Sequence, residues 1–280
     1  MIVPVNGAEL FCSRRGAGPV CLVPSAMGTK LYEQQMPPQL SAAQELVFID
    51  LRGGGQSTGD PSILTFDRVA EDLEAVRVHL GVDKVTVLAH STIGILAIEY
   101  GRRCPETVSH VITVGTPPRG DMEWLLSESM QFFERDASEE RKGAWRDNMA
   151  KLPPGTPFEQ SFPAQAPIRC FDFRTDMSLL YKDAVVRLEL FSHLMGKLIN
   201  GWDVTVDANS LRVPILLTHG RYDYTVPYIL WENIEPVLPT ATLKVFSQSG
   251  HQPFYEEPEE FATVVSDWMK KQGNASETAV

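Results

Sequence analysis

Features that mark a metalloprotein, a disulfide-bonded domain or a membrane protein are scarce in this sequence. Its 280 residues contain four cysteines, with no C-x-x-C spacing and no histidines at metal-ligand spacing, so neither a zinc site nor a disulfide framework is predicted. No apolar run approaches the length of a membrane span, and residues 1–13 lack the residue order of a signal peptide. The sequence therefore predicts a cytoplasmic protein without a metal, whose cysteines are buried thiols: Cys12, Cys21, Cys104 and Cys170.

Positive charge is also scarce. The chain has 25 lysines and arginines against 36 aspartates and glutamates, a formal net charge of −11, and no basic run that could hold a polyanion. Arg52 and the glycines at 53–55 match neither G-x-x-x-x-G-K-[ST] nor a G-x-G-x-x-G that opens a helix, so they are interpreted as a structural turn. The predicted partner is a small-molecule substrate, with no cofactor, no nucleic acid and no membrane, and no oligomeric state is predicted.

Short apolar runs alternate with helical patterns along the first 118 residues. Asn6-Gly7 between two apolar stretches predicts a hairpin over residues 1–13. Val69, Leu73, Val76 and Leu80 form a helical stripe that Gly81 ends. Strands buried on both faces, separated by helices, indicate a mostly parallel sheet with crossover helices. The expected strands are Val20 to Pro24, Leu46 to Asp50, Val85 to Ala89 and Val108 to Gly115.

This alternation stops after Pro117-Pro118. Residues 119–207 have no β-type run and include an expected helix from about Leu179 to Ile199, which predicts a helical cap inserted after the sixth strand. The alternation then resumes with expected strands at 213–218 and 242–246, an expected helix at 226–238 and another at 258–271. The predicted organisation is an α/β core formed by 1–118 and 208–272, a helical cap at 119–207 and a disordered tail at 273–280.

A serine stands where one buried strand meets a helix. The apolar run from Val85 to Ala89 ends before His90-Ser91, and Ile93, Leu96, Ala97 and Tyr100 then repeat at helical spacing. Such a joint projects the Ser91 hydroxyl from the edge of the sheet, and the Thr92 N–H points into the same space. The sequence therefore makes Ser91 a candidate nucleophile, with a helix N-cap as the alternative interpretation.

Two more chemical groups follow later strands. Asp223 comes after the strand at 213–218, and His251 comes after the strand at 242–246. The carboxyl ends of parallel strands meet at one edge of a sheet, so these side chains are expected near Ser91. Asp203 and Asp207 are alternatives for the acid, but they precede a strand and belong to the opposite edge. The order Ser, Asp, His is that of the α/β-hydrolase triad.

The chain resembles α/β-hydrolases of the proline-iminopeptidase and esterase group along nearly its whole length. The motifs that carry the resemblance are Asp50-Leu51-Arg52-Gly53-Gly54-Gly55-Gln56-Ser57, Ala89 to Gly94, Gly220-Arg221-Tyr222-Asp223 and Ser249-Gly250-His251. The resemblance implies that Ser91 is the nucleophile, that His251 is the general base and acid, and that Asp223 orients His251. It also implies an oxyanion hole formed by the backbone N–H groups of Ala26 and Thr92.

The chain departs from the family pattern near both oxyanion positions. Pro24-Ser25 replaces the usual His-Gly, and Thr92-Ile93 replaces the Trp-Gly that follows the nucleophile in proline iminopeptidases. Ile93 also stands where a glycine normally lets the helix pack closely on the strand, so a neighbouring adjustment is expected. Of the other histidines, His90 is expected to face away from the pocket, and the rest are expected to pack or to lie at the surface: His79, His110, His193 and His219.

Three functions remain open at this level. The leading one is a serine hydrolase that cleaves a carboxylic ester or lactone of a partly hydrophobic substrate through an acyl-enzyme. The second is an aminopeptidase of the proline-iminopeptidase kind, in which acidic residues of the cap receive the substrate's amino group; the candidates are Glu123, Glu134, Asp172 and Asp176. The third is a ligand receptor on the same fold without turnover.

Overall fold

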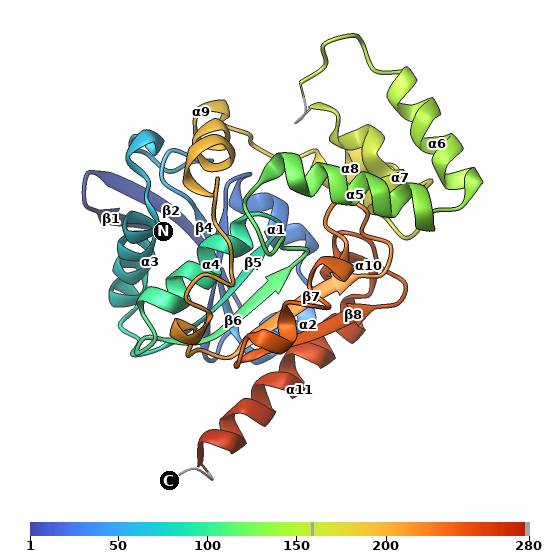
Figure 1. Ribbon diagram of the computed structural model, residues 1–280. Helices are drawn as coiled ribbons and strands as arrows, with labels where there is room; N and C mark the ends of the chain where they lie inside the picture. The colour runs from blue at the N-terminus through green and yellow to red at the C-terminus, as the bar shows by residue number, and fades with distance from the viewer. Residues whose placement is uncertain (158–159, 278–280) are drawn as a thin grey trace.

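The structure, a computed structural model, describes residues 1–157 and 160–277. Eight strands form one sheet in the order β1-β2-β4-β3-β5-β6-β7-β8. Only the β1–β2 and β2–β4 pairs are antiparallel, and the other neighbours run parallel. The predicted hairpin and parallel sheet are thus confirmed (Figure 1). The strands are β1 (Ile2–Val5), β2 (Ala8–Arg15), β3 (Val20–Ser25), β4 (Glu45–Asp50), β5 (Val85–His90), β6 (Val108–Val114), β7 (Ile215–Gly220) and β8 (Ala241–Phe246).

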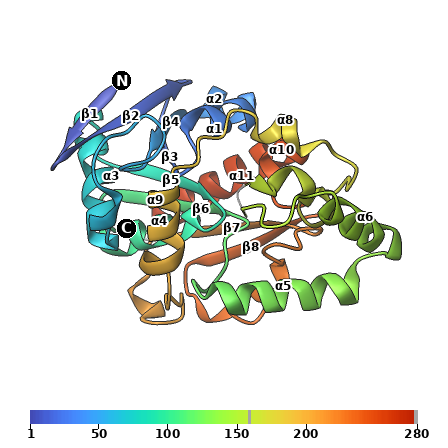
Figure 2. The same ribbon diagram turned by 90° about the horizontal axis from the view of Figure 1, so that it is seen from above.

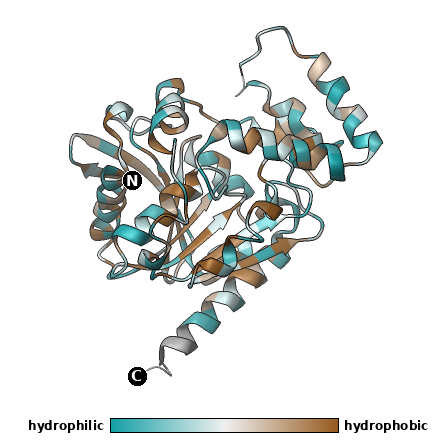
Figure 3. Ribbon diagram, viewed as in Figure 1, coloured by the Kyte–Doolittle hydropathy of each residue, from teal (hydrophilic) through white to brown (hydrophobic). Residues whose placement is uncertain are grey.

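The central strands are apolar on both faces because helices cover both. On β4, Val47 and Ile49 belong to the core shared with α3 and α4, whereas Leu46 and Phe48 belong to the core on the other face, which α1, α2 and α11 complete. Figure 3 shows the resulting hydrophobic strands at the centre of the molecule. The helices are α1 (Thr29–Gln35), α2 (Pro38–Ala43), α3 (Phe66–Leu80), α4 (Ile93–Arg103), α10 (Pro253–Glu256) and α11 (Pro258–Glu277).

Helix α3 shows how local sequence sets an element. The Thr65 side chain accepts a hydrogen bond from the Arg68 N–H at the first turn, and Gly81 ends the helix in the left-handed region at φ 69°. Gly81 is the C-terminal end that the sequence indicates, and the N-cap at Thr65 is of an ordinary kind. The predicted stripe of Val69, Leu73 and Val76 is buried against the sheet.

A long segment separates β6 from β7, and we call residues 119–207 the inserted segment. Its helices α5 to α8 lie together beyond the ends of the strands, as Figures 1 and 2 show from two directions. None of its described residues joins the sheet; a single antiparallel bridge pairs Arg119 with Asp203. The helices are α5 (Met122–Asp136), α6 (Glu139–Ala150), α7 (Ala166–Arg169), α8 (Met177–Tyr181) and α9 (Leu188–His193).

Three expected segments differ from the prediction. The expected helix at 226–238 is two short 3₁₀ turns, Tyr228–Leu230 and Glu235–Val237, because Pro227 and Pro236 lack the N–H that a continuous helix needs. The expected helix at 179–199 is broken into α8, α9 and a π-turn at Leu194–Leu198.

The break between α8 and α9 has a tertiary cause, because the Val185 N–H bonds the Met27 carbonyl of the core at 2.8 Å. At the C-terminus, α11 continues to Glu277, so the tail expected to be disordered is helical over 273–277, and 278–280 lie outside the described residues. Among the described helices, none is both long and apolar enough to cross a membrane.

The loop after β4 is a structural turn, as predicted. The Arg52 guanidinium makes two hydrogen bonds to the Asp72 carboxylate of α3, at 2.6 and 2.9 Å, and a third to the Asn6 carbonyl at 2.9 Å. Both side chains of the ion pair are almost completely buried. The arginine thus joins the loop, the hairpin turn and α3.

We expect Asp72→Ala to lower the free energy of unfolding by about 3–5 kcal/mol, because it leaves the Arg52 charge buried without its partner. Asp67→Ala on the same helix is the control, because the Asp67 carboxylate is 78% exposed and surface pairs contribute about 0–1 kcal/mol. Urea denaturation of both variants measures the difference. Equal losses would contradict the structural role of the buried pair.

Candidate active site

Ser91 occupies a strained backbone turn between β5 and α4. Its φ is 58°, a left-handed conformation that non-glycine residues adopt rarely and mostly at functional turns. The turn is held on both sides, because the Ser91 N–H bonds the Val114 carbonyl at 2.7 Å and the Thr116 hydroxyl donates to the Ser91 carbonyl at 2.8 Å. Strand, strained serine and helix together form the elbow that the sequence predicts.

The close approach of α4 to the sheet occurs at Gly94, one residue later than in the family pattern. A Cβ on Gly94 would overlap the side chain of Thr116. Ile93 has no such constraint, and its side chain lines the cavity beside Ser91. The missing glycine at position 93 is therefore compensated by the glycine at position 94.

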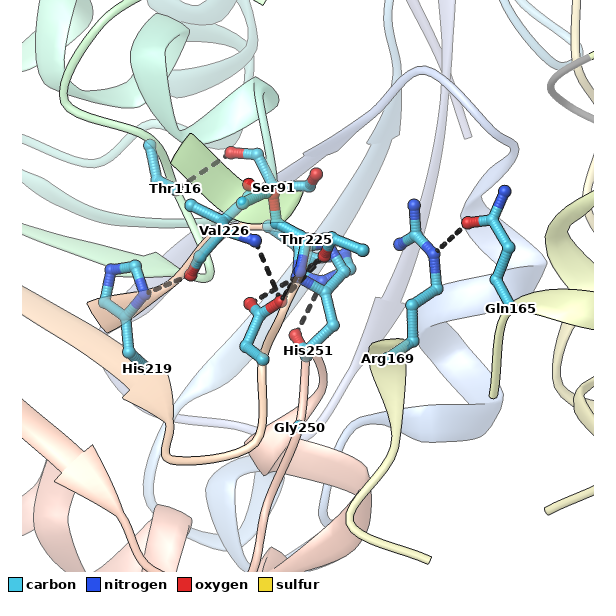
Figure 4. A network of polar contacts seen from close by, with 12 residues as sticks. Ser91, Thr116, Gln165, Arg169, His219, Thr225, Val226, Gly250 and His251 are labelled. Atoms are coloured by element: carbon cyan, nitrogen blue, oxygen red, sulfur yellow. Dashed lines mark hydrogen bonds and ion pairs between the residues drawn. The ribbon is translucent and has the colours of Figure 1, made fainter. Parts of the chain in front are cut away.

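Asp223 and His251 form a buried hydrogen-bonded pair. The His251 Nδ1 lies 2.7 Å from the Asp223 Oδ2, and both side chains are at most 1% exposed. The other carboxylate oxygen, Oδ1, accepts hydrogen bonds from the N–H groups of Thr225 and Val226 and from the Thr225 hydroxyl (Figure 4). Burial alone would raise the pKa of Asp223, but His251 and these donors outweigh it and hold the pKa below its ordinary value.

The imidazole of His251 has a second nitrogen, Nε2, which Asp223 does not bind. Its Nε2 is buried and has no hydrogen-bond partner among the described residues. His251 and Ser91 line the same cavity, although the two are not hydrogen bonded here. Catalytic hydrogen bonds are often long or misaligned in ligand-free enzymes. The arrangement therefore places His251, which the Asp223 carboxylate orients and whose Nε2 is not hydrogen bonded, in the cavity that Ser91 also lines.

His90 corrects one expectation. Its side chain does not face away from the pocket but lines it, with its ring centroid 4.5 Å from that of His251. The His90 Nε2 lies 3.0 Å from the His251 carbonyl and its Nδ1 lies 3.0 Å from the Tyr32 hydroxyl. Burial, and then the neighbouring His251, lower the pKa of His90 well below its ordinary value. His90 is therefore a neutral ring that donates to the His251 carbonyl and accepts from Tyr32.

Both expected oxyanion donors line the cavity. The backbone N–H groups of Ala26 and Thr92 have no hydrogen-bond partner within the described part of the chain. Ser25, which replaces the family's glycine, builds the turn that carries Ala26. Its hydroxyl accepts from the Met27 N–H and donates to the Gly28 carbonyl, each at 3.0 Å, and the residue is fully buried. The departure at Pro24-Ser25 therefore still leaves the Ala26 N–H available.

The cavity has a volume of about 270 Å³ and lies between the sheet and the inserted segment. Most of its wall is apolar, and the inserted segment supplies much of it; examples are Leu125, Met130, Phe162, Phe191 and Met195. The acidic residues that an aminopeptidase site would use do not line it: Glu123, Glu134, Asp172 and Asp176. Asp203 and Asp207 are also absent from the wall. Within the described ranges, no three acidic, histidine or cysteine side chains converge as a metal site would require.

The inserted segment is hydrogen bonded to the loops that carry Asp223 and His251. The His251 N–H donates to the Arg169 carbonyl at 2.6 Å, and the Tyr224 N–H donates to the Ile168 carbonyl at 3.0 Å. The Glu256 carboxylate accepts from the N–H of Phe171 at 2.6 Å and from the N–H of Gly250 at 2.7 Å. These bonds couple the position of His251 to the inserted segment.

Sequence reasoning missed several residues of this site. Gly115 follows β6 with φ 57°, and a Cβ there would lie 2.8 Å from the His251 Nδ1. A glycine directly after a buried strand was the available signal. Thr225 lies two residues after the aspartate, at the spacing of a side-chain turn. Nothing in the sequence pattern distinguished Arg169.

The comparisons with known proteins agree with this geometry. The model of the alpha/beta hydrolase fold family matches residues 18–258, so the chain belongs to that family. It is 27% identical to AB hydrolase superfamily protein YclE of Bacillus subtilis (strain 168), over 94% of this chain and 96% of that protein. It is 25% identical to a proline iminopeptidase of Heyndrickxia coagulans, over 93% of each.

A solved structure shows the same fold. A thermophilic esterase from Thermogutta terrifontis superposes with a TM-score of 0.71 at 21% sequence identity. The match covers 97% of this chain and 98% of that one.

We expect Gly115→Ala to separate His251 from Asp223, because the added methyl group meets both side chains. Hydrolysis of p-nitrophenyl acetate should fall more than tenfold in kcat, and the downfield proton resonance of the Asp223–His251 hydrogen bond should shift or broaden. Gly81→Ala is a matched control: its φ is 69°, but a Cβ there meets nothing within 4 Å. If both variants lose the same activity, backbone strain and not the site explains the loss.

A second prediction concerns Glu256, whose pKa burial raises to about 7. The carboxyl ionises in the unfolded chain near its ordinary value of 4.5, so its contribution to stability is complete below that pH and is lost as pH rises through about 7. The free energy of unfolding of the native protein should therefore fall, relative to Glu256→Gln, between pH 5 and pH 8. Urea denaturation across this range measures it, with Glu259→Gln as the exposed control. Parallel profiles for the native protein and Glu256→Gln would rule out this titration.

Proposed function

We propose that this protein is a cofactor-independent serine hydrolase that cleaves a carboxylic ester or lactone through an acyl-enzyme. The observation that carries the proposal is the buried Asp223–His251 pair, which shares a cavity with the strained Ser91 and leaves the His251 Nε2 without a hydrogen-bond partner among the described residues. The hydrolase family to which the chain belongs is consistent with this chemistry. The mostly apolar wall favours a substrate with a hydrophobic portion.

In the proposed reaction, the Ser91 Oγ forms a bond to the acyl carbon as its proton passes to the His251 Nε2. The carbonyl oxygen becomes an oxyanion that accepts hydrogen bonds from the N–H groups of Ala26 and Thr92. The intermediate then collapses, the bond to the alcohol oxygen breaks, and His251 protonates that oxygen. For a lactone, the leaving alcohol remains attached to the acyl group.

Deacylation repeats these steps with water. His251 takes a proton from the water as its oxygen bonds the acyl carbon, and then returns the proton to the Ser91 oxygen as the acid departs. Asp223 stays ionised throughout, because its hydrogen-bond donors hold its pKa low, and it stabilises the imidazolium that forms twice in each cycle.

An aminopeptidase of the proline-iminopeptidase kind is the second candidate, favoured by the relative of that name. Its substrate carries a protonated amine, which a pocket would receive with a carboxylate. No Asp or Glu among the described residues lines the cavity, and a cationic arginine does. This charge pattern favours the ester or lactone substrate. The third candidate is a ligand receptor on the same fold that catalyses no reaction. Any measured substrate turnover would refute it.

The test combines a fluorophosphonate probe, detected by mass, with hydrolysis of p-nitrophenyl esters of graded acyl length and of proline p-nitroanilide. The native protein should label once and hydrolyse the esters in preference to the anilide. Ser91→Ala should abolish labelling and lower kcat by on the order of 10⁴-fold or more, and Asp223→Asn by on the order of 10⁴-fold. Faster anilide cleavage would favour the aminopeptidase, and absence of labelling and turnover would favour the receptor.

A further inference from the structure

The cavity contains one formal charge that nothing in the proposed reaction uses. Arg169 is the only lysine or arginine among the described residues that line it, and no aspartate or glutamate lines it. The arginine is only 8% exposed. It is the last residue of α7, and its carbonyl accepts the His251 N–H. The positive charge therefore stands beside the proposed catalytic histidine.

The charge of Arg169 has no anionic partner among the described residues. Its Nε donates to the Gln165 Oε1 at 2.6 Å, and its guanidinium carbon lies 5.0 Å from the centre of the Phe162 ring. Figure 4 shows the side chain rising alongside His251 and bonded to Gln165. The amide nitrogen of Gln165 is itself held by the Ser161 hydroxyl at 2.6 Å. The guanidinium is thus oriented by the neutral Gln165 amide and by a hydrogen bond with the Tyr181 side chain, and no carboxylate of the described residues neutralises it.

The other two buried arginines of the described residues are satisfied by protein groups, Arg52 by a carboxylate and Arg141, which also lacks an anionic partner, by backbone carbonyls. Arg52 is neutralised by Asp72. Arg141 donates to three backbone carbonyls, those of Pro167, Cys170 and Phe171, at 2.7 to 2.9 Å. Those bonds also fix the backbone on both sides of Arg169. Burying a charge without a counterion destabilises the folded protein unless a ligand supplies the counterion. The contacts of Arg169 hold such a charge at the wall of the substrate cavity.

We propose that Arg169 binds a carboxylate of the substrate, distinct from the carbonyl that Ser91 attacks. The inference rests on the proposed function, which makes this cavity the substrate site. Guanidinium and carboxylate groups match in geometry and form charge-assisted hydrogen bonds. The substrate class is then a monoanionic ester or lactone with an apolar stretch between the carboxylate and the scissile bond.

The test first measures binding without turnover, in the Ser91→Ala background. Two ligands are compared by calorimetry: monomethyl adipate, and methyl 6-methylheptanoate, in which a neutral isopropyl group replaces the carboxylate. The anionic ester should bind about 10- to 100-fold more tightly, the usual range for a hydrogen-bonded charge. Adding Arg169→Gln should remove that preference, and Arg169→Lys should keep part of it. Arg174→Gln is the control, because it removes an arginine of the same segment that is 65% exposed.

Turnover of the same two esters is then measured with Ser91 intact. Arg169→Gln should raise KM for monomethyl adipate about tenfold or more and leave the neutral ester within about threefold. Equal weakening of both esters, or no preference for the anion in the Ser91→Ala protein, would overturn the role of Arg169 while leaving the proposed hydrolase intact. An anion preference that depends on Arg169, without hydrolysis of either ester, would refute the hydrolase and retain the carboxylate site.

Discussion

The hydrogen bond between Asp223 and His251 is the interaction on which the rest of the site depends. Both side chains are buried, so contacts with the protein, and not with water, set their orientation. Thr225 and Val226 donate hydrogen bonds to the Asp223 carboxylate, and Gly115 leaves the space that the pair occupies. Because one carboxylate oxygen accepts three hydrogen bonds, the other is left to fix the imidazole through Nδ1, and the Nε2 of the ring keeps no hydrogen-bond partner among the described residues.

The inserted segment does more than cover the sheet. The Ile168 and Arg169 carbonyls accept hydrogen bonds from the backbone N–H groups of the two loops that carry the pair. The Phe171 N–H donates to the Glu256 carboxylate, which also accepts from the backbone beside His251. Arg141 donates hydrogen bonds to three backbone carbonyls of the same stretch, residues 167–171. The walls of the cavity and the position of His251 are therefore set by one hydrogen-bonded unit. A change in the inserted segment would therefore alter the cavity wall and the position of His251 together.

Much of the fold followed from local pattern. Buried apolar runs, the Gly81 stop of α3 and the Asn6-Gly7 turn predicted the sheet, one of its helices and its first hairpin, because burial period and turn chemistry are local properties. The expected helix at 226–238 was wrong because Trp231 packs into the core from a turn bounded by prolines. His90 lies on the same face of β5 as Leu88, as alternation along the strand requires. It was misplaced because the tertiary structure brings His251 and the cavity to that face.

By itself, the sequence determined the order Ser91, Asp223, His251 and the sheet edge at which each would lie, because strand direction and connectivity are properties of the chain pattern. Only the tertiary structure decided which atoms meet. It placed the Ser25 hydroxyl where it builds the turn that carries Ala26. It made Gly94 the residue at which α4 packs closely on Thr116, and it brought Arg169 to the cavity without a counterion. These outcomes depend on contacts between residues far apart in the chain, and no local pattern encodes them.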